Sequence, residues 1–190
     1  LFFENVRIPR DNLLNRFADV TDDGRYVSSI DSADKRFFTM LGTLVQGRVC
    51  VSGAGINAAK VALSLAVHYA VRRRQFNATS QRDEELLLDY GLHQRRLLPL
   101  LAENYALHFA QEVLAQKTHD VFSVRTGDDE DEQARRELEA RAAGTKALGT
   151  WHGTRAIQEG REACGGAGYL AVNRFAALKA DTDVFTTFEG

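Results

Sequence analysis

The sequence contains very little proline and very little cysteine. Only two of its 190 residues are prolines, Pro9 and Pro99, and only two are cysteines, Cys50 and Cys164. So few prolines in a chain rich in alanine, leucine, arginine and glutamate argue against an all-β sandwich, which needs many turns. Two separated cysteines exclude a disulfide-stapled scaffold, and neither belongs to a cysteine and histidine cluster with metal-ligand spacing. We therefore expect no metal site.

The chain also lacks an excess of one charge and a long apolar run. It has 24 basic and 26 acidic residues and a net charge of −2, so a nucleic-acid partner is not expected. No stretch of about 18 residues is both apolar and uncharged, so no membrane span is predicted. No secretory signal pattern is visible, so secretion is not expected. The remaining composition, 44% hydrophobic and 26% charged, is ordinary for a globular domain that buries a core.

Three long stretches of the sequence have the apolar spacing of helices. Apolar residues recur every three, four or seven positions from about Phe37 to Arg74, and similar stripes run from Glu84 to Lys117 and from Asp131 to Ala163. A shorter fourth element is predicted near Ala171–Leu178. The predicted fold class is therefore all-α, an antiparallel helical bundle over residues 35–190.

Residues 1–34 are predicted as an extended lead-in to this bundle. Leu1–Asn15 mixes phenylalanine and valine with polar residues, which suits a short edge strand stopped by Pro9. The sequence Asp-Asp-Gly at residues 22–24 predicts a turn. A loop is predicted over residues 118–132, and its acidic end suits either a cation site or, more simply, a solvated loop that precedes a helix.

Small residues are concentrated in the first and third predicted helices. In an isolated helix each glycine lowers stability by up to about 1 kcal/mol relative to alanine, so these residues need another explanation. They allow close approach of a neighbouring helix or of a ligand, and helix packing is the simpler interpretation. The residues are Gly42, Gly47, Gly53 and Gly55 in the first helix and Ala142, Ala143, Gly144, Ala147, Gly149, Gly153 and Ala156 in the third.

Three short patterns near helix ends are candidates for chemistry. The cluster Gly165–Gly168 serves either as a helix C-cap or as a place where backbone N–H groups approach a phosphate. The arginines in Arg72–Phe76 suit either an anion site or a solvated helix terminus. Glu189 follows aromatic and β-branched residues, so it is either a surface residue or a base in an apolar pocket. Taken singly, each pattern fits both interpretations.

Together, in this order and spacing, the patterns resemble the C-terminal helical domain of acyl-CoA dehydrogenases and oxidases. Arg73-Arg-Gln-Phe is similar to that family's Arg-x-x-Phe loop, and Gly165-Gly-Ala-Gly-Tyr to its Gly-Gly-x-Gly-aromatic turn. Phe188-Glu-Gly is similar to the aromatic-Glu-Gly segment that carries the family's catalytic base. The opening stretch Phe3–Leu14 resembles the segment that enters this domain. Within the family, Thr150-Trp-His and neighbouring segments are most similar to acyl-CoA oxidases.

The resemblance implies FAD as the cofactor and a homodimer with the flavin near the subunit interface. In the family, the Arg-x-x-Phe loop reaches the flavin dinucleotide bound to the partner subunit. A glutamine follows this loop, and both Gln81 and Gln94 fit its place, with Gln94 on the helix as the better match. The implied cofactor-binding residues are Arg73, Phe76, Gln94, Gly165 and Gly166.

The resemblance also implies a reaction, the oxidation of a fatty acyl-CoA to its trans-2-enoyl-CoA. Glu189 would remove the α-proton while the β-hydrogen leaves as a hydride, and O2 would accept the electrons to give H2O2. Arg48, which precedes Arg73 by 25 residues, and Gly190 would contact the acyl-CoA substrate. One alternative is a dehydrogenase that passes electrons to an electron-transferring flavoprotein. The other is a helical interaction module without catalysis.

The sequence departs from the family pattern at one flavin-binding position, and it covers only part of the family's full chain. Glu162 stands where dehydrogenases usually carry a glutamine that helps to hold the flavin pyrophosphate, so no role is carried over to it. The resemblance implies a missing β-domain before residues 1–34 and a bundle truncated at its C-terminal end. The isolated chain is therefore expected to be inactive and to hold FAD weakly. The expected location is the peroxisome or a bacterial cytoplasm.

Overall fold

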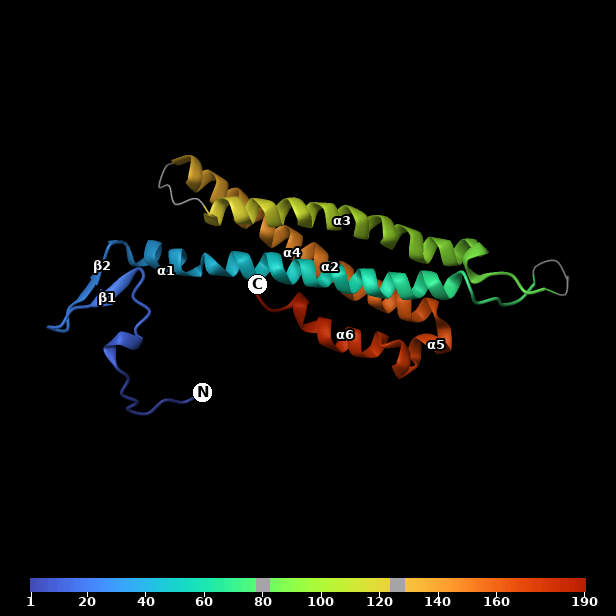
Figure 1. The fold of residues 1–190 in the computed structure, drawn as a ribbon, viewed down its shortest axis with the longest axis horizontal. Helices are drawn as coiled ribbons and strands as arrows, with labels where there is room; N and C mark the ends of the chain where they lie inside the picture. The colour runs from blue at the N-terminus through green and yellow to red at the C-terminus, as the bar shows by residue number, and fades with distance from the viewer. Residues whose placement is uncertain (78–82, 124–128) are drawn as a thin grey trace. The chain divides into compact units, whose positions relative to one another are not determined.

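The computed structural model describes residues 1–77, 83–123 and 129–190, with side chains left out for residues 129–131. The chain divides into two compact units, Leu1–Thr43 and Leu44–Gly190. In Figure 1 the first unit is a short β-ribbon followed by a helix, and the second is a bundle of long helices.

The first unit contains a two-stranded antiparallel sheet. Strands β1 (Ala18–Val20) and β2 (Tyr26–Ser28) pair along their whole length. They are joined by the predicted turn at residues 22–24, where the glycine has a φ of 83°. Helix α1 (Ala33–Leu41) follows, and the hydroxyl of Ser32 caps it by accepting a backbone N–H bond from its first turn.

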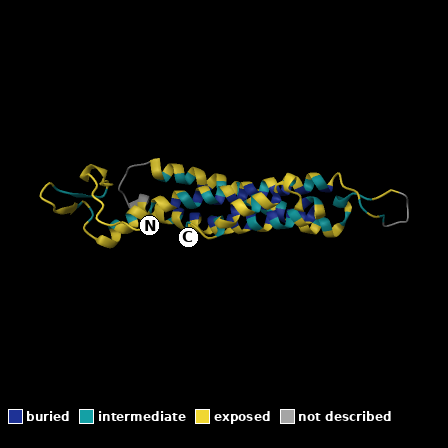
Figure 2. Ribbon diagram, turned by 90° about the horizontal axis from the view of Figure 1, so that it is seen from below, coloured by how far each residue is buried: buried dark blue, intermediate teal, exposed yellow. Residues whose placement is uncertain are grey.

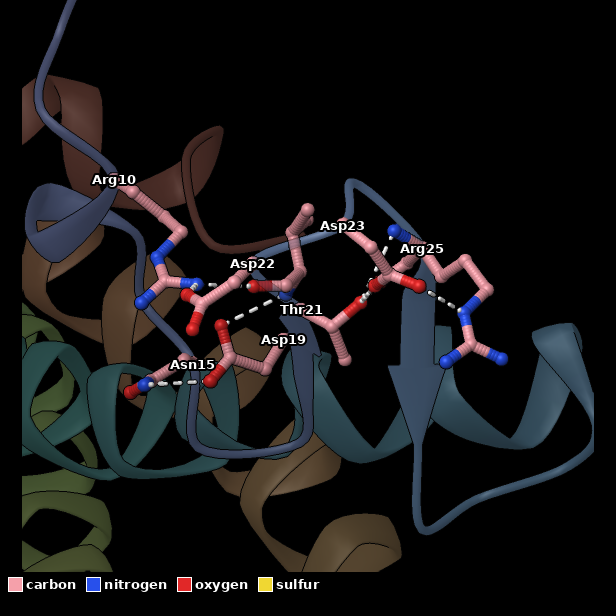
Figure 3. A network of polar contacts seen from close by, with 8 residues as sticks. Arg10, Asn15, Asp19, Thr21, Asp22, Asp23 and Arg25 are labelled. Carbon is pink, nitrogen blue, oxygen red and sulfur yellow. Dashed lines mark hydrogen bonds and ion pairs between the residues drawn. The ribbon is translucent and has the colours of Figure 1, made fainter.

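A polar network surrounds the β1–β2 turn (Figure 3). Arg10 pairs with Asp22, the Thr21 hydroxyl binds Asp23, and Arg25 Nε donates to Asp23 Oδ2 at 2.7 Å. The bond from Thr21, and then that from Arg25, holds the pKa of the exposed Asp23 carboxyl below its usual value. Because none of residues 1–43 is buried, this ribbon is held by polar contacts rather than by an apolar core.

The prediction of an edge strand within Leu1–Asn15 is wrong. These residues form no strand, and their one regular element is a 3₁₀ turn, η1 (Arg10–Asn12). The side chains of Leu1, Phe2 and Phe3 are all at least 75% exposed, so they have no neighbouring strand or core to pack against within this unit.

The second unit is an all-α antiparallel bundle, which confirms the predicted fold class. Figure 1 shows the long helices running alongside one another, followed by shorter helices near the end of the chain. The helices are α2 (Thr43–Ala70), α3 (Gly91–Ser123), α4 (Asp129–Ala163), α5 (Gly165–Tyr169) and α6 (Phe175–Asp183), with 3₁₀ turns η2 (Leu87–Asp89), η3 (Ala171–Asn173) and η4 (Val184–Thr186).

The predicted second helix, residues 84–117, needs correction at both ends. Helix α3 begins only at Gly91, because the chain before it pairs with the chain after α2. Gln75 N donates to the Glu85 carbonyl, and Glu85 N donates back to the carbonyl of the residue after Gln75, each at 2.9 Å. At the other end α3 continues to Ser123, through part of the predicted loop. The next five residues of that loop lie outside the described chain.

Other boundaries also differ from the predicted ones. The first predicted helix, residues 37–74, is two helices that meet at Gly42, and the second of them ends at Ala70. The fourth element is α6, which starts four residues later than expected because a 3₁₀ turn precedes it. The described part of the acidic run, residues 129–132, opens α4, and no cluster suited to a metal occurs among the described residues.

Helices α2 and α4 approach each other closely, as the small residues predicted. A methyl group added at Gly153 would lie 2.7 Å from the Gly55 carbonyl oxygen, and one added at Gly149 would lie 2.9 Å from Ser52 Oγ. Real contacts are never that short, so larger residues would force the helices apart. Figure 2 shows buried residues gathered along the interior of the bundle.

The helical stretch that contains α2 is apolar enough to be compared with membrane-spanning helices. The helical stretch Ala33–Ala70 is long and apolar enough to cross a bilayer by length and composition, but 56% of its most apolar window is buried. Such burial is typical of a core helix in a bundle, so the comparison establishes no membrane span.

Candidate active site

The carboxyl end of the chain lies against the N-terminal half of α2. After η4 the chain turns sharply, and Glu189 and Gly190 both have left-handed backbone conformations, with φ of 62° and 82°. Arg48 Nε, on α2, donates to the Glu189 carbonyl oxygen at 2.8 Å. The structure therefore brings together the predicted base and the predicted substrate-binding residues Arg48 and Gly190.

Gly47 makes room for the side chain of Glu189. A methyl group added at Gly47 would lie 2.8 Å from both Cδ and Oε2 of Glu189. Gly47 was expected to serve helix packing, but its open face is filled by this carboxyl group. Any larger residue would displace the carboxyl, because the position is fixed by the α2 backbone.

One oxygen of the Glu189 carboxyl group, Oε2, is buried without a hydrogen-bond partner within the described part of the chain. Phe185 and Phe188 precede Glu189 in the sequence, and their rings pack edge to face with their centroids 5.9 Å apart. A buried, unsatisfied acceptor is rare in folded proteins, so this oxygen needs a functional or structural explanation.

Sequence reasoning missed a lysine at this site. Lys146, on α4, is only 2% exposed, and its Nζ donates to the Gly190 carbonyl oxygen at 2.9 Å. A signal for it was present, since Leu138, Ala142, Lys146 and Thr150 are spaced four apart and are each at most 2% exposed. A lysine at a core position of a helix is rare without a buried partner.

The predicted flavin-binding residues Arg73 and Phe76 lie at the other end of α2. Both follow the end of that helix, in the segment that pairs with residues 85–87. Arg73 is exposed, and Phe76 is 71% exposed and has a left-handed φ of 56°. Gln94 lies near the start of α3, where its Nε2 donates to the Leu88 carbonyl at 2.9 Å. The other candidate, Gln81, is outside the described residues.

The structure does not bring Arg73 and Phe76 together with Glu189. Arg48, which contacts Glu189, is 22 residues before the end of α2 at Ala70, a helical rise of about 33 Å. In Figure 1 the C-terminus lies beside the first half of α2, far from the loop that follows this helix. The bundle therefore carries two separate groups of candidate residues.

Gly165 and Gly166 belong to the same end of the bundle as Arg73. They end α4 and begin α5, and Gly165 has a left-handed φ of 54°, as a helix-ending glycine requires. Both are exposed, and a methyl group on either would meet nothing within 4 Å. The sterically required glycine of this cluster is Gly168, where an added methyl group would overlap the Arg161 carbonyl oxygen.

A cavity of about 720 Å³ adjoins Phe76 at this end. Tyr90, His93 and Arg96 line it, and the Tyr90 hydroxyl donates to the Gln75 carbonyl at 2.5 Å. Burial, and then the charge of Arg96, lowers the pKa of His93. Its Nε2 is buried without a hydrogen-bond partner among the described residues.

Glu162 is an ionised carboxylate with its own partners. Gln158 Nε2 donates to it at 2.7 Å, and Arg96 lies 3.3 Å away. The Gln158 bond is the main cause that lowers the pKa of Glu162, and the nearby positive charges lower it further. The carboxylate that departs from the dehydrogenase pattern is thus neutralised within the chain.

The helical bundle, with Glu189 in a tight turn at one end and the Arg-x-x-Phe loop at the other, agrees with the class that the motifs resemble, the acyl-CoA dehydrogenases and oxidases. Residues 41–190 match the family model described as the acyl-CoA oxidase C-alpha1 domain. The chain belongs to the acyl-CoA oxidase family, as the sequence motifs predicted.

Individual relatives agree with this assignment. The chain is 45% identical to the peroxisomal acyl-coenzyme A oxidase 3 of Arabidopsis thaliana over all of its length and 27% of the relative. It is 42% identical to the human peroxisomal acyl-coenzyme A oxidase 3, over 99% of its length and 27% of the relative. The chain therefore spans about a quarter of the curated relatives that it matches.

Solved structures have the same fold. The Arabidopsis thaliana acyl-CoA oxidase 1 superposes with a TM-score of 0.84 at 37% identity, over 99% of this chain and 27% of that one. Acyl-CoA oxidase-1 of Caenorhabditis elegans, solved in complex with FAD and ATP, gives a TM-score of 0.84 at 28% identity, over 99% of this chain and 26% of that one.

Proposed function

We propose that the full-length protein oxidises fatty acyl-CoA thioesters to trans-2-enoyl-CoA, with FAD as cofactor and O2 as electron acceptor. The observation that carries this proposal is the Glu189 carboxyl group, seated on Gly47 with one buried oxygen free. The α-proton of the substrate goes to Glu189, and the β-hydrogen leaves with its electron pair. O2 takes up the two electrons and two protons to give H2O2, so the step balances.

Glu189 acts as a general base whose geometry is set before the substrate binds. The free oxygen Oε2 has a lone pair available for the α-proton, and the Arg48 contact holds the backbone from which the side chain extends. A positioned general base typically accelerates a reaction about 100- to 10,000-fold. Arg48 and Gly190, beside the base, would contact the thioester end of the substrate.

The residues at the far end of the bundle fit a bound FAD. Arg73 offers an exposed guanidinium for a phosphate, Phe76 an exposed ring, and Gly165 and Gly166 leave open space beside their backbone. When bound, FAD supplies the acceptor for the β-hydrogen and its electron pair. Because these residues lie so far from Glu189 of the same chain, they support a homodimer in which each chain contributes them to its partner's flavin.

The peroxisome is the location that we propose for the full protein. The Arabidopsis thaliana and human relatives are both named as peroxisomal oxidases, and they match the whole or nearly the whole of this chain. These names favour the peroxisome over a bacterial cytoplasm.

The test is peroxide formation by the full-length protein with acyl-CoA. Glu189→Gln is expected to lower kcat about 100- to 10,000-fold while the flavin absorbance remains, because the amide cannot take the proton. Glu139→Gln, on the exposed face of α4, is the matched control and should retain activity. Near-normal turnover by Glu189→Gln would contradict the role of the base. Dye reduction without peroxide would indicate a dehydrogenase, and a colourless protein that takes up no FAD would indicate an interaction module.

A further inference from the structure

We propose that Lys146 is a positioning residue for the catalytic base, acting through the backbone of the residue after it. Lys146 Nζ donates to the Gly190 carbonyl at 2.9 Å, while Arg48 Nε donates to the Glu189 carbonyl at 2.8 Å. Two consecutive carbonyl groups are thus held by cations from two different helices, α4 and α2. This inference rests on the proposed function, since it assigns Glu189 the role of base.

Packing of the core does not explain why a lysine is buried at position 146. Its side chain is 2% exposed, at a position where the preceding and following core residues, Ala142 and Thr150, are small and need no charge beside them. Among the described residues no carboxylate lies within ion-pair distance of it, and the Gly190 carbonyl is its hydrogen-bond acceptor. Because burying a lysine lowers stability, its presence here indicates a function for that one bond.

The turn that Lys146 holds needs support. Glu189 has a φ of 62°, a left-handed conformation that residues with a side chain rarely adopt. Such conformations persist only when surrounding contacts enforce them, and they concentrate at active sites. The bonds from Arg48 and Lys146 are two contacts of that kind, one to the carbonyl of the Glu189–Gly190 peptide and one to the next carbonyl along the chain.

The position of the turn decides where the carboxyl group lies. The Gly47 backbone closes one side of the carboxyl group, so a shift of the turn cannot be absorbed there. A misplacement of about 1 Å at a reacting group can lower a rate about 100-fold. Loss of the Lys146 bond should therefore slow proton removal and leave the binding of substrate and FAD intact.

The experiment compares Lys146→Met with the wild type in the flavin-loaded, full-length protein. Methionine keeps the length of the side chain but removes the donor. We expect kcat to fall about 10- to 100-fold, with KM and flavin content little changed. Thr150→Val, one turn further along the same buried face of α4, is the matched control, since among the described residues the Thr150 hydroxyl bonds to carbonyl groups of α4 itself. It should retain kcat.

Two further measurements separate positioning from a structural role. Lys146→Met should unfold at the same temperature as the wild type or higher, because an apolar side chain replaces a buried amine. Exchange of the α-hydrogens of 3,3-dimethylbutanoyl-CoA in D2O reports proton removal alone, since this thioester has no β-hydrogen to lose. The exchange rate should fall by the same factor as kcat.

Each outcome has a defined meaning. A stable, flavin-loaded Lys146→Met protein with slow exchange and low kcat supports the inference, and wild-type values of both rates would overturn it. If Lys146→Met does not fold, Lys146→Gln, which also removes the charge and shortens the side chain, is measured in the same way and must show the same loss. If the wild-type protein itself does not turn over acyl-CoA, the proposed function is wrong. If the wild type is active and Lys146→Met matches it, only the role of Lys146 is wrong.

Discussion

The candidate functional residues at the two ends of the bundle differ in how far the chain itself holds them in place. At the Glu189 end, side chains of the same chain hold the turn, with bonds from Arg48 and Lys146 and a space left by Gly47. At the other end, Phe76 and Arg73 project into solvent from a loop. The first end is built before a ligand arrives, and the second is open to one.

This difference shows what each end can do alone. A preformed turn suits proton removal, since a base must be in place at the moment of reaction. An exposed arginine and phenylalanine gain contacts only when a phosphate and an aromatic or apolar group arrive from outside the chain.

After the base itself, the largest effect at the preformed end is expected from Gly47→Ala. The added methyl group would lie 2.8 Å from the Glu189 carboxyl carbon and push the carboxyl group away, so kcat should fall about 100-fold. Gly144→Ala is the control for a glycine replaced in a helix, because its added methyl group meets nothing within 4 Å. Peroxide assays measure kcat of both variants. Equal values would show that the space at Gly47 is not needed to position the Glu189 carboxyl group.

The next effect is expected at the open end, from Arg73→Met. Loss of a charge-assisted contact to phosphate should weaken FAD binding about 10- to 100-fold, measured by flavin titration of the apoprotein. The exposed neighbour Arg72→Met is the matched control and should bind FAD normally. Unchanged FAD affinity in Arg73→Met would contradict the assignment of this end to the cofactor.

An effect on stability is expected between the two ends, at the contact of α2 with α4. Gly153→Ala would place a methyl group 2.7 Å from the Gly55 carbonyl, so the free energy of unfolding should fall by about 1–3 kcal/mol. Denaturant titration measures this fall against Gly144→Ala. If both variants were equally stable, the close approach of the two helices would be wrong.

The smallest effect concerns pH and the buried His152. Burial is the main cause that lowers its pKa below the ordinary value of 6.5, so the folded bundle binds this proton less readily than the unfolded chain does. Stability from this group is therefore present above about pH 6.5 and is lost as the pH falls below it, by at most about 1.4 kcal/mol per pH unit. Unfolding measured at several pH values should show this slope, and His152→Asn should reduce it; an unchanged slope would refute the role of His152.

Much of the fold could be predicted because long helices have strong local signals. The apolar spacing located all three long helices, and the small residues around Gly55 and Gly153 predicted their close contact. The boundaries near Gly91 were missed, because pairing between Gln75 and Glu85 is a contact between segments that no local pattern encodes. The strand predicted within Leu1–Asn15 was wrong for the same reason, because a strand forms only where a second strand pairs with it.

The candidate site was predicted unevenly. Glu189 and Arg48 were found by their resemblance to family motifs, and the structure places them in contact. Lys146 and Gly47 were missed as parts of this site, because their roles depend on a turn more than 40 residues away in sequence. The separation of Arg73 from Glu189 follows from the length of α2, which the helical spacing does predict.

The most direct measurement uses heterodimers of the full-length protein, purified with two different tags. If each chain contributes Glu189 to one site and Arg73 to the other, a dimer of Glu189→Gln and Arg73→Met subunits keeps one intact site. A dimer of wild type and the double variant then has none. We therefore predict about half of the wild-type activity in the first heterodimer and far less in the second. The reverse order of activities would contradict the assignment of the two ends of the bundle to different active sites.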